Sequence, residues 1–254
     1  MLRALCFMKI LYFFKKLFKF LFHITNTKKI ISDIGSFNIC ANQKQAEKIR
    51  LWFKKILDIV DVKLVVKGKV KEGNYLIISN HSSWLDIVIL GSIFQTTFLS
   101  KIEISRWPVL GKITTAVDML FIDRGAKNAA NKAVQDISQY IQNNRNVTIF
   151  PEGTSSGGKG LLNFKPRLFA SCIEANCPVQ CVTIKYPFKG ERMHPTVPFV
   201  RKNSLFLNIL KVLYRNDIIA EVSIVDFVDT ENKNRKDISK ECYEIVKNNL
   251  ENNA

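Results

Sequence analysis

The 254-residue sequence lacks three features that would each define a class of protein. It has no uncharged apolar run approaching the roughly 20 residues that a transmembrane helix requires, which argues against a simple membrane span. Its six cysteines include no Cys-x-x-Cys pair, and no histidine stands at zinc-finger spacing, so we expect reduced thiols and no metal site. No internal repeat or low-complexity linker interrupts the chain, which favours one globular domain with a short appendage.

Acidic residues are also scarce. The chain has 22 Asp and Glu against 38 Lys and Arg, which gives a formal net charge of +16. Such a charge favours anionic partners, meaning nucleic acid, an anionic membrane surface or phosphorylated ligands. No helix-turn-helix or other nucleic-acid-binding module is recognisable, so we expect anionic membrane lipids rather than nucleic acid.

Residues 2–24 predict a helix that lies in a membrane interface. The segment is rich in Leu, Ile and Phe, with basic residues throughout. At 100° per residue its lysines and Tyr12 share an arc of about 120°, and apolar side chains fill the rest. The lysines would face lipid headgroups and the phenylalanines the acyl boundary. Lys9 interrupts the apolar region that a signal peptide needs, whereas a helix packed on the protein's own core is an open alternative.

Residues 43–60 predict a second basic amphipathic helix, and the two helices together predict a membrane-facing hairpin. We therefore divide the chain into N-terminal membrane-interface helices, residues 1–61, and a second domain, residues 62–254.

Short β-rich runs alternate with helical stretches in the second domain. This alternation predicts an α/β fold, a mixed and largely parallel sheet flanked by helices, behind the N-terminal amphipathic two-helix membrane-binding motif. The expected strands are residues 63–66, 75–79, 97–100, 119–122, 147–150, 179–185 and 218–228, and the expected helices are residues 84–94, 126–143, 165–175 and 233–250.

His81 and Asp86 pair an imidazole, which ordinarily titrates near neutral pH, with a carboxylate that could orient it. They stand between an apolar strand and a helix, where ligands of open α/β sheets bind. On one regular helix they would lie about 140° apart, so they meet only if His81 is in the turn and Asp86 in the first helical turn. The run from Ser83 to Asp86 also reads as a capping box, which is a structural alternative for the carboxylate.

Two further motifs suggest phosphate binding. The loop from Phe150 to Gly160 follows another apolar strand, and its glycines, hydroxyl groups and Lys159 can approach phosphate oxygens. Arg124 closes a short strand and could bind a phosphate through two hydrogen bonds. A flexible turn and a surface ion pair with Asp123 are the respective alternatives.

Taken in order, the motifs resemble the four blocks of the glycerolipid acyltransferase family, and within it the bacterial 1-acylglycerol-3-phosphate acyltransferases. The resemblance covers about residues 62–230 and includes Lys101-Ile102-Glu103 between the first two blocks. The blocks are His81-x4-Asp86, Phe121-Ile122-Asp123-Arg124, Phe150-Pro151-Glu152-Gly153-Thr154 and Cys177-Pro178-Val179-Gln180-Cys181-Val182.

The resemblance implies a single-step transfer of an acyl group from acyl-CoA or acyl carrier protein to a lysophospholipid hydroxyl, with no covalent acyl-enzyme and no cofactor. It makes His81 the general base and Asp86 the group that holds its imidazole, a chemistry that suits a weak hydroxyl nucleophile. By the same resemblance, the second and third blocks hold the glycerol phosphate of the acceptor, and Pro178 shapes the wall of the site. The substrate-binding residues expected are Lys101, Arg124, Glu152, Gly153, Thr154, Lys159, Lys165 and Pro178.

Ser155 departs from the family pattern, because many members carry an arginine there. One expected phosphate contact is therefore missing, and Lys159, Lys165 or Arg167 could replace it. Asp118, Gln180 and Cys181 also replace residues that are common in the family.

The expected function is acyl transfer to the sn-2 hydroxyl of 1-acylglycerol-3-phosphate, which gives phosphatidic acid in phospholipid biosynthesis. The expected location is the cytoplasmic face of the cell membrane, with peripheral or monotopic attachment through the N-terminal helices. The alternatives are another lysolipid acceptor, such as lyso-ornithine lipid, and a non-enzymatic basic protein that binds nucleic acid or membranes.

Overall fold

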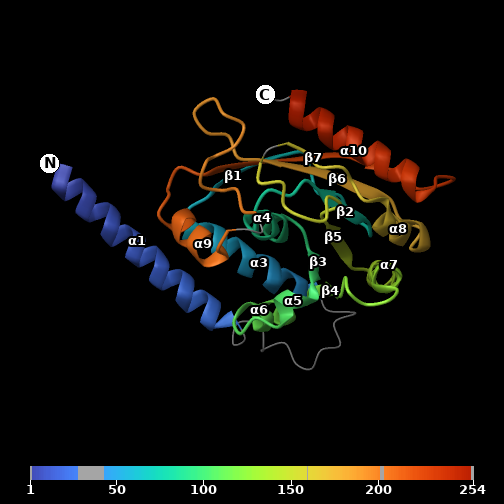
Figure 1. Cartoon of the computed structure of the whole chain (residues 1–254), viewed down its shortest axis with the longest axis horizontal. Helices are drawn as coiled ribbons and strands as arrows, with labels where there is room; N and C mark the ends of the chain where they lie inside the picture. The colour runs from blue at the N-terminus through green and yellow to red at the C-terminus, as the bar shows by residue number, and fades with distance from the viewer. Residues whose placement is uncertain (1, 28–42, 159, 201–202, 253–254) are drawn as a thin grey trace.

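A single seven-stranded sheet organises the protein, seen in a computed structural model that describes residues 2–27, 43–158, 160–200 and 203–252 (Figure 1). The strands are β1 (Lys63–Lys67), β2 (Leu76–Ser79), β3 (Thr96–Lys101), β4 (Leu120–Ile122), β5 (Asn146–Ile149), β6 (Val179–Lys185) and β7 (Ile219–Val228). Their order across the sheet is β1-β7-β6-β2-β5-β3-β4. The pairing of β6 with β7 is antiparallel and the other pairings are parallel. This arrangement confirms the predicted mixed, largely parallel sheet.

The two faces of the sheet carry separate cores. Because side chains alternate along a strand, Ile77 of β2 enters one core while Leu76 and Ile78 enter the other. The first core is covered by α3 (Gln43–Val60), α4 (Leu85–Ile93), α6 (Leu110–Ala116) and α9 (Leu205–Leu213). The second is covered by α7 (Ala129–Gln142), the 3₁₀ helix η2 (Pro166–Phe169), α8 (Ala170–Glu174) and α10 (Arg235–Asn252).

Three short helices were not expected from the sequence. They are α5 (Ile102–Ser105), α6 and α9. The first two span only 4 and 7 residues, too few for an apolar repeat to show. Helix α9 spans only 9 residues, and its polar face consists of Asn208 and Lys211, too few positions for a helical period to stand out.

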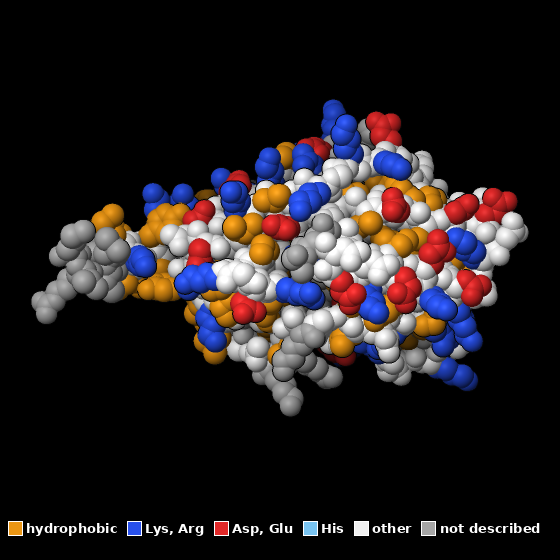
Figure 2. Space-filling model, turned by 90° about the horizontal axis from the view of Figure 1, so that it is seen from above, with side chains coloured by type: hydrophobic (Ala, Val, Ile, Leu, Met, Phe, Trp, Pro, Cys, Tyr) orange, Lys and Arg blue, Asp and Glu red, His pale blue; other side chains and the backbone are white. Residues whose placement is uncertain are grey.

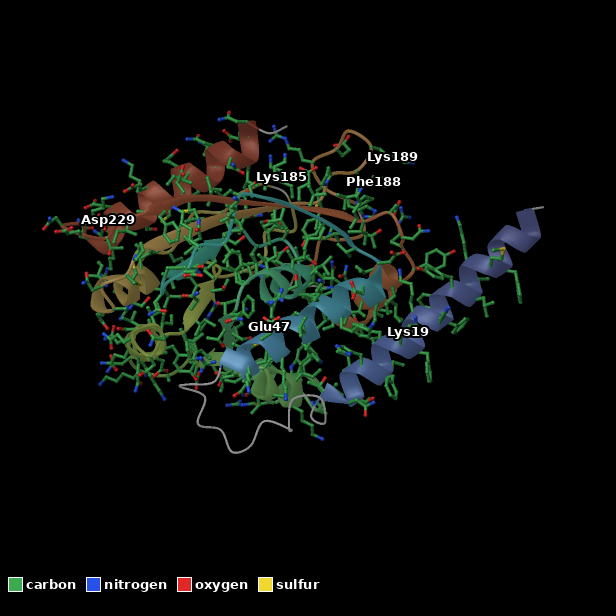
Figure 3. The ribbon with its side chains drawn as sticks, turned by 180° about the vertical axis from the view of Figure 1, so that it is seen from behind. Lys19, Glu47, Lys185, Phe188, Lys189 and Asp229 are labelled. Carbon is green, nitrogen blue, oxygen red and sulfur yellow. The ribbon has the colours of Figure 1, made fainter. Side chains whose placement is uncertain are left out.

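Helix α3 does not face a membrane, as the predicted hairpin would require. Its apolar face, including Trp52, Phe53 and Ile56, is buried in the first core. A Cβ atom added at Gly91 of α4 would come within 2.3 Å of the Phe53 ring, which shows how closely the two helices approach. Glu47, near the start of α3, instead pairs with Arg50 at 2.6 Å on the outer side (Figure 3). The core therefore continues across residue 61, and the domain boundary predicted there stays a prediction.

Helix α1 (Leu2–Thr25) extends away from the sheet and docks on the domain through one face (Figure 1). Phe20 and His23 are buried there, and Lys16 donates a hydrogen bond of 2.6 Å to the Arg215 carbonyl oxygen. Lys16 thus faces the protein, not the lipid headgroups as we expected, whereas Lys19 is exposed (Figure 3).

The opposite face of α1 is apolar and exposed. Figure 2 shows hydrophobic side chains beside Lys and Arg along this part of the molecule. Within the described ranges, no helix is both long and apolar enough to cross a membrane. The exposed apolar residues of α1 include Phe7, Leu11, Phe14, Phe18, Leu21 and Phe22.

Replacing Phe53 tests whether α3 belongs to the core. The Phe53→Ala substitution should lower the free energy of unfolding by about 3 to 5 kcal/mol, because it leaves a cavity against α4. Leu51→Ala is the matched control on the same helix, since Leu51 is 48% exposed, and it should change stability by less than about 0.5 kcal/mol. Urea unfolding measures both values. Equal and small losses would mean that α3 is not packed in this way.

Candidate active site

His81 and Asp86 meet at the carboxyl end of β2. His81 lies in the turn after the strand, and Asp86 is the second residue of α4, the arrangement that their spacing requires. Nδ1 of His81 is 2.9 Å from Oδ2 of Asp86. Because a carboxylate oxygen only accepts hydrogen bonds, Nδ1 is the donor, and the Nε2 lone pair is left for another group.

Asp86 also holds the turn that leads into α4. Its side chain is fully buried, and Oδ2 accepts hydrogen bonds from the backbone N–H groups of Ser82 at 2.6 Å and Ser83 at 2.8 Å. The N–H of Leu85 donates to Oγ of Ser83 at 3.3 Å. The contacts of Asp86 with the turn before α4 and with the histidine therefore occur together, and one carboxylate makes both.

Asn80 and Phe150, which were not among the predicted site residues, fix the position of His81. The Asn80 side chain bridges to β6, because its Nδ2 donates to the Ile184 carbonyl at 3.0 Å and its Oδ1 accepts from the Ile184 N–H at 2.8 Å. The Phe150 ring stacks on the imidazole, with centroids 4.0 Å apart and planes inclined by 18°. Together they hold the imidazole between the ends of β5 and β6.

Glu152 supports His81 and does not face an open site. Only 2% of its surface is exposed, and its two oxygens accept hydrogen bonds from the N–H of His81 at 2.6 Å and of Leu162 at 3.0 Å. Burial raises the pKa of Glu152 to about 7, although both N–H donors oppose the shift. The structure thus gives Glu152 a supporting role, and its predicted part in substrate binding stays a prediction.

The glycine-rich loop is tied to the same histidine from its other end. The N–H and the Oγ of Ser156 both donate to the His81 carbonyl oxygen, at 2.8 Å and 3.1 Å. His81 thus has its N–H and its C=O bound by one loop. The first and third sequence blocks form a single unit.

Arg124 and Lys165 converge on Gly153 of this loop. Arg124 donates from Nη2 to the Gly153 carbonyl oxygen at 3.0 Å. Gly153 has a φ of +73°, and a Cβ atom there would lie 3.0 Å from Nζ of Lys165. Both cationic side chains are exposed, and Arg124 lines a surface cavity of about 260 Å³ together with Arg167 and the start of α7.

Lys101, Thr154 and Lys159 are the next predicted site residues to place in the structure. Lys101 ends β3 and Thr154 is exposed in the loop, so both lie at the same edge of the sheet as His81. Lys159 lies outside the described residues.

Pro178 lies at the far end of β2 from His81. It precedes β6, and its carbonyl oxygen accepts a hydrogen bond from the Leu76 N–H, at the amino end of β2. With a rise of about 3.3 Å per residue, it stands roughly 13 Å from the His81 end of that strand, so it does not contact His81 and its role in the site wall stays a prediction.

Tyr186 is the residue at this site that sequence reasoning missed most completely. It follows β6 directly, its side chain is fully buried, and its hydroxyl donates to Oδ1 of Asp86 at 2.6 Å. It lies 100 residues from Asp86 in the chain, and no local pattern marks it.

Residues 61–185 match the family model described as Acyltransferase. This segment contains the histidine–carboxylate pair, the arginine strand end and the glycine-rich loop. This segment, about half of the chain, is therefore an acyltransferase-family domain.

Particular relatives differ in the lipid that their names specify. Over 198 residues the chain is 29% identical to a lyso-ornithine lipid O-acyltransferase of Pseudomonas aeruginosa, covering 78% of this chain and 76% of that protein. Over 133 residues it is 35% identical to a 1-acyl-sn-glycerol-3-phosphate acyltransferase of Neisseria meningitidis. That match spans about half of the Neisseria protein, 52% of each chain.

A solved structure has the same fold. It is a 1-acyl-sn-glycerophosphate acyltransferase of Thermotoga maritima, with a TM-score of 0.69 over 99% of this chain and 97% of that chain, at 19% identity.

Glu152 predicts a pH-dependent stability. Between its ordinary pKa of 4.5 and about 7, the unfolded chain releases the proton that the folded protein keeps, so the free energy of unfolding falls as the pH rises. The shift corresponds to about 3 kcal/mol. Glu152→Gln should lack this fall, although its amide satisfies only one N–H and costs about 1 to 3 kcal/mol at every pH. Urea unfolding from pH 4 to 8 measures the difference between the two proteins, and a constant difference would contradict the raised pKa.

Proposed function

We propose that the protein transfers an acyl group from a thioester, acyl-CoA or acyl carrier protein, to the sn-2 hydroxyl of 1-acylglycerol-3-phosphate and so forms phosphatidic acid. The observation that carries this proposal is the His81–Asp86 pair with Nε2 of the imidazole left as acceptor. A hydroxyl is a poor nucleophile until its proton is removed, and a positioned neutral imidazole removes it.

The proposed reaction needs one base and no covalent intermediate. Nε2 of His81 takes the proton of the acceptor hydroxyl while the hydroxyl oxygen attacks the thioester carbonyl carbon. The carbon–sulfur bond then breaks, and the leaving thiolate takes the proton back from the imidazolium. Asp86 stabilises the imidazolium that forms between these two proton transfers.

The acceptor's phosphate is proposed to bind at Arg124 and Lys165. Both reach Gly153, whose loop is hydrogen-bonded to His81, so an anion there would sit at a fixed position relative to the base. The name of the Neisseria relative supports a phosphate-bearing acceptor.

Lyso-ornithine lipid is the second candidate acceptor. The Pseudomonas relative with this name aligns over more of the chain than the Neisseria relative does. Ser155, which stands where a cationic contact would be expected, donates its hydroxyl to the Phe199 carbonyl at 2.5 Å instead of facing a ligand. Both observations favour an acceptor with fewer phosphate contacts.

We also propose that α1 holds the enzyme on the cytoplasmic face of the membrane as a peripheral protein. Its outward face is apolar, and the exposed Lys15 and Lys19 flank that face. Such a helix lies in the interface with its apolar side among acyl chains and its lysines near anionic headgroups.

His81→Ala tests the mechanism. The substitution should lower kcat, measured per folded molecule, by about 10² to 10⁴-fold, which is what a general base contributes. It also removes one hydrogen-bond donor from the buried Asp86 carboxylate, so the free energy of unfolding should fall as well. The chain offers a matched control in His194, which is buried and whose Nε2 is 3.3 Å from Asp217. His194→Ala should keep its activity per folded molecule. A folded His81→Ala protein with full activity would exclude this mechanism.

A substrate panel decides the acceptor. Purified protein is assayed with 1-acylglycerol-3-phosphate and with lyso-ornithine lipid, each with acyl-CoA and with acyl carrier protein as donor. We expect higher kcat/KM for the phosphate-bearing acceptor, and Arg124→Ala should raise its KM about tenfold or more with little effect on the other. Transfer to lyso-ornithine lipid alone would establish the second candidate instead.

A further inference from the structure

The buried carboxylate of Asp86 is surrounded by hydrogen-bond donors. An ionised carboxylate has about four acceptor positions on its two oxygens. Oδ2 accepts from His81 Nδ1 and from the backbone N–H groups of Ser82 and Ser83, whereas Oδ1 accepts from the Tyr186 hydroxyl. Tyr186 is thus the donor that determines which way the second oxygen points.

Tyr186 reaches Asp86 from a different part of the sheet. It follows β6 and is anchored through its carbonyl oxygen, which accepts a hydrogen bond of 2.6 Å from the His194 N–H. The next residues form a turn that carries Phe188 and Lys189, closed by two backbone hydrogen bonds between Phe188 and Glu191 (Figure 3). The hydroxyl is therefore held by backbone that does not belong to the four sequence blocks.

The hydroxyl is a donor throughout the pH range in which an imidazole titrates. Burial and the negative charge of Asp86 raise the pKa of Tyr186 well above its ordinary value of 10.0. The phenol therefore stays protonated. A hydrogen bond to a charged acceptor is among the stronger ones, and it withdraws negative charge from the carboxylate.

We propose that Tyr186 is a positioning residue for the acyl transfer: its hydroxyl fixes the Asp86 carboxylate and limits the negative charge that His81 faces, so that the imidazole stays neutral and able to accept a proton. The inference rests on the proposed function. Without the hydroxyl, the carboxylate would carry more charge toward Nδ1, would favour the inactive imidazolium and could rotate away from the turn.

Tyr186→Phe tests this role. It should lower kcat roughly tenfold with KM little changed, and it should move the acidic limb of the kcat/KM profile to higher pH by about one unit. Tyr75→Phe is the matched control, because Tyr75 is also buried and its hydroxyl donates to the Lys71 carbonyl at 2.8 Å before the amino end of β2. That variant should keep the profile of the unmodified protein. An unmoved profile in Tyr186→Phe, with activity lost only in proportion to the folded fraction, would overturn the proposal.

Other groups that titrate beside His81 are controlled separately. Among the described residues, the groups that face His81 are Asp86 from α4 and Glu152 from the loop after β5, and Tyr186 acts on it through Asp86. The pKa of Glu152 is raised to about 7, so Glu152 could also produce an acidic limb near neutral pH. The effect of Tyr186→Phe on the pH of the acidic limb is therefore measured again in a Glu152→Gln background. The shift should persist there. Its disappearance would assign the limb to Glu152 and overturn the role of Tyr186.

One further arm keeps the test decisive if Tyr186→Phe does not fold, and a second arm applies if it does fold. Incorporation of 3-fluorotyrosine at position 186 keeps the hydroxyl and strengthens its donation, so the acidic limb should move to lower pH. In an Asp86→Asn background, Tyr186→Phe should cost little further activity, because the charge on which it acts is gone. Full additivity of the two losses would contradict the proposal.

Two different outcomes distinguish failure of this proposal from failure of the proposed function. An active His81→Ala protein would remove the mechanism itself, whereas an inactive His81→Ala protein with an unmoved Tyr186→Phe profile would remove the positioning role alone.

Discussion

The burial of the Asp86 carboxylate is the constraint on which the active-site end of the fold depends. A charge removed from water costs several kcal/mol unless donors replace the solvent, and removing one donor from such a group is strongly destabilising. Here the donors come from the turn after β2 and from the end of β6. The turn, the start of α4 and the end of β6 must therefore be in place together. The same hydrogen bonds that stabilise the buried carboxylate also orient the His81 imidazole.

Hydrogen bonds to one loop also connect the proposed base to the proposed anion-binding groups. The N–H and C=O of His81 are both bound by the loop that contains Glu152 and Ser156, and Arg124 bonds to the same loop at Gly153. A displacement of the loop would move the imidazole and the cation together. Such a rigid unit suits a reaction without a covalent intermediate, because rate then depends on holding the two reactants in one geometry.

The sequence predicted the sheet well because central parallel strands are apolar at nearly every position, as in β2, and such runs are visible without a partner. It could not say what covers an amphipathic helix. The apolar stripe of α3 would suit a membrane as well as a core, and only the sheet face beneath Trp52 and Phe53 decides between them. His81 and Asp86 were found because they are close in the chain. Tyr186 was not, because its contact depends on β6 lying beside β2. The distance of Pro178 from His81 was not predicted either, because a block that is next in order along the chain can still begin at the far end of a strand.

The choice of acceptor cannot come from the histidine pair, because proton removal from a hydroxyl is the same chemistry for any lysolipid. It has to come from groups that meet the headgroup, and Arg124 and Lys165 beside the Gly153 loop are exposed cationic side chains that could do so. Ser155 holds the loop in place without adding a cation, because its hydroxyl donates a hydrogen bond to the Phe199 carbonyl oxygen. Two relatives of this chain carry the names of different lysolipids, and a fold does not by itself fix the substrate that its site accepts.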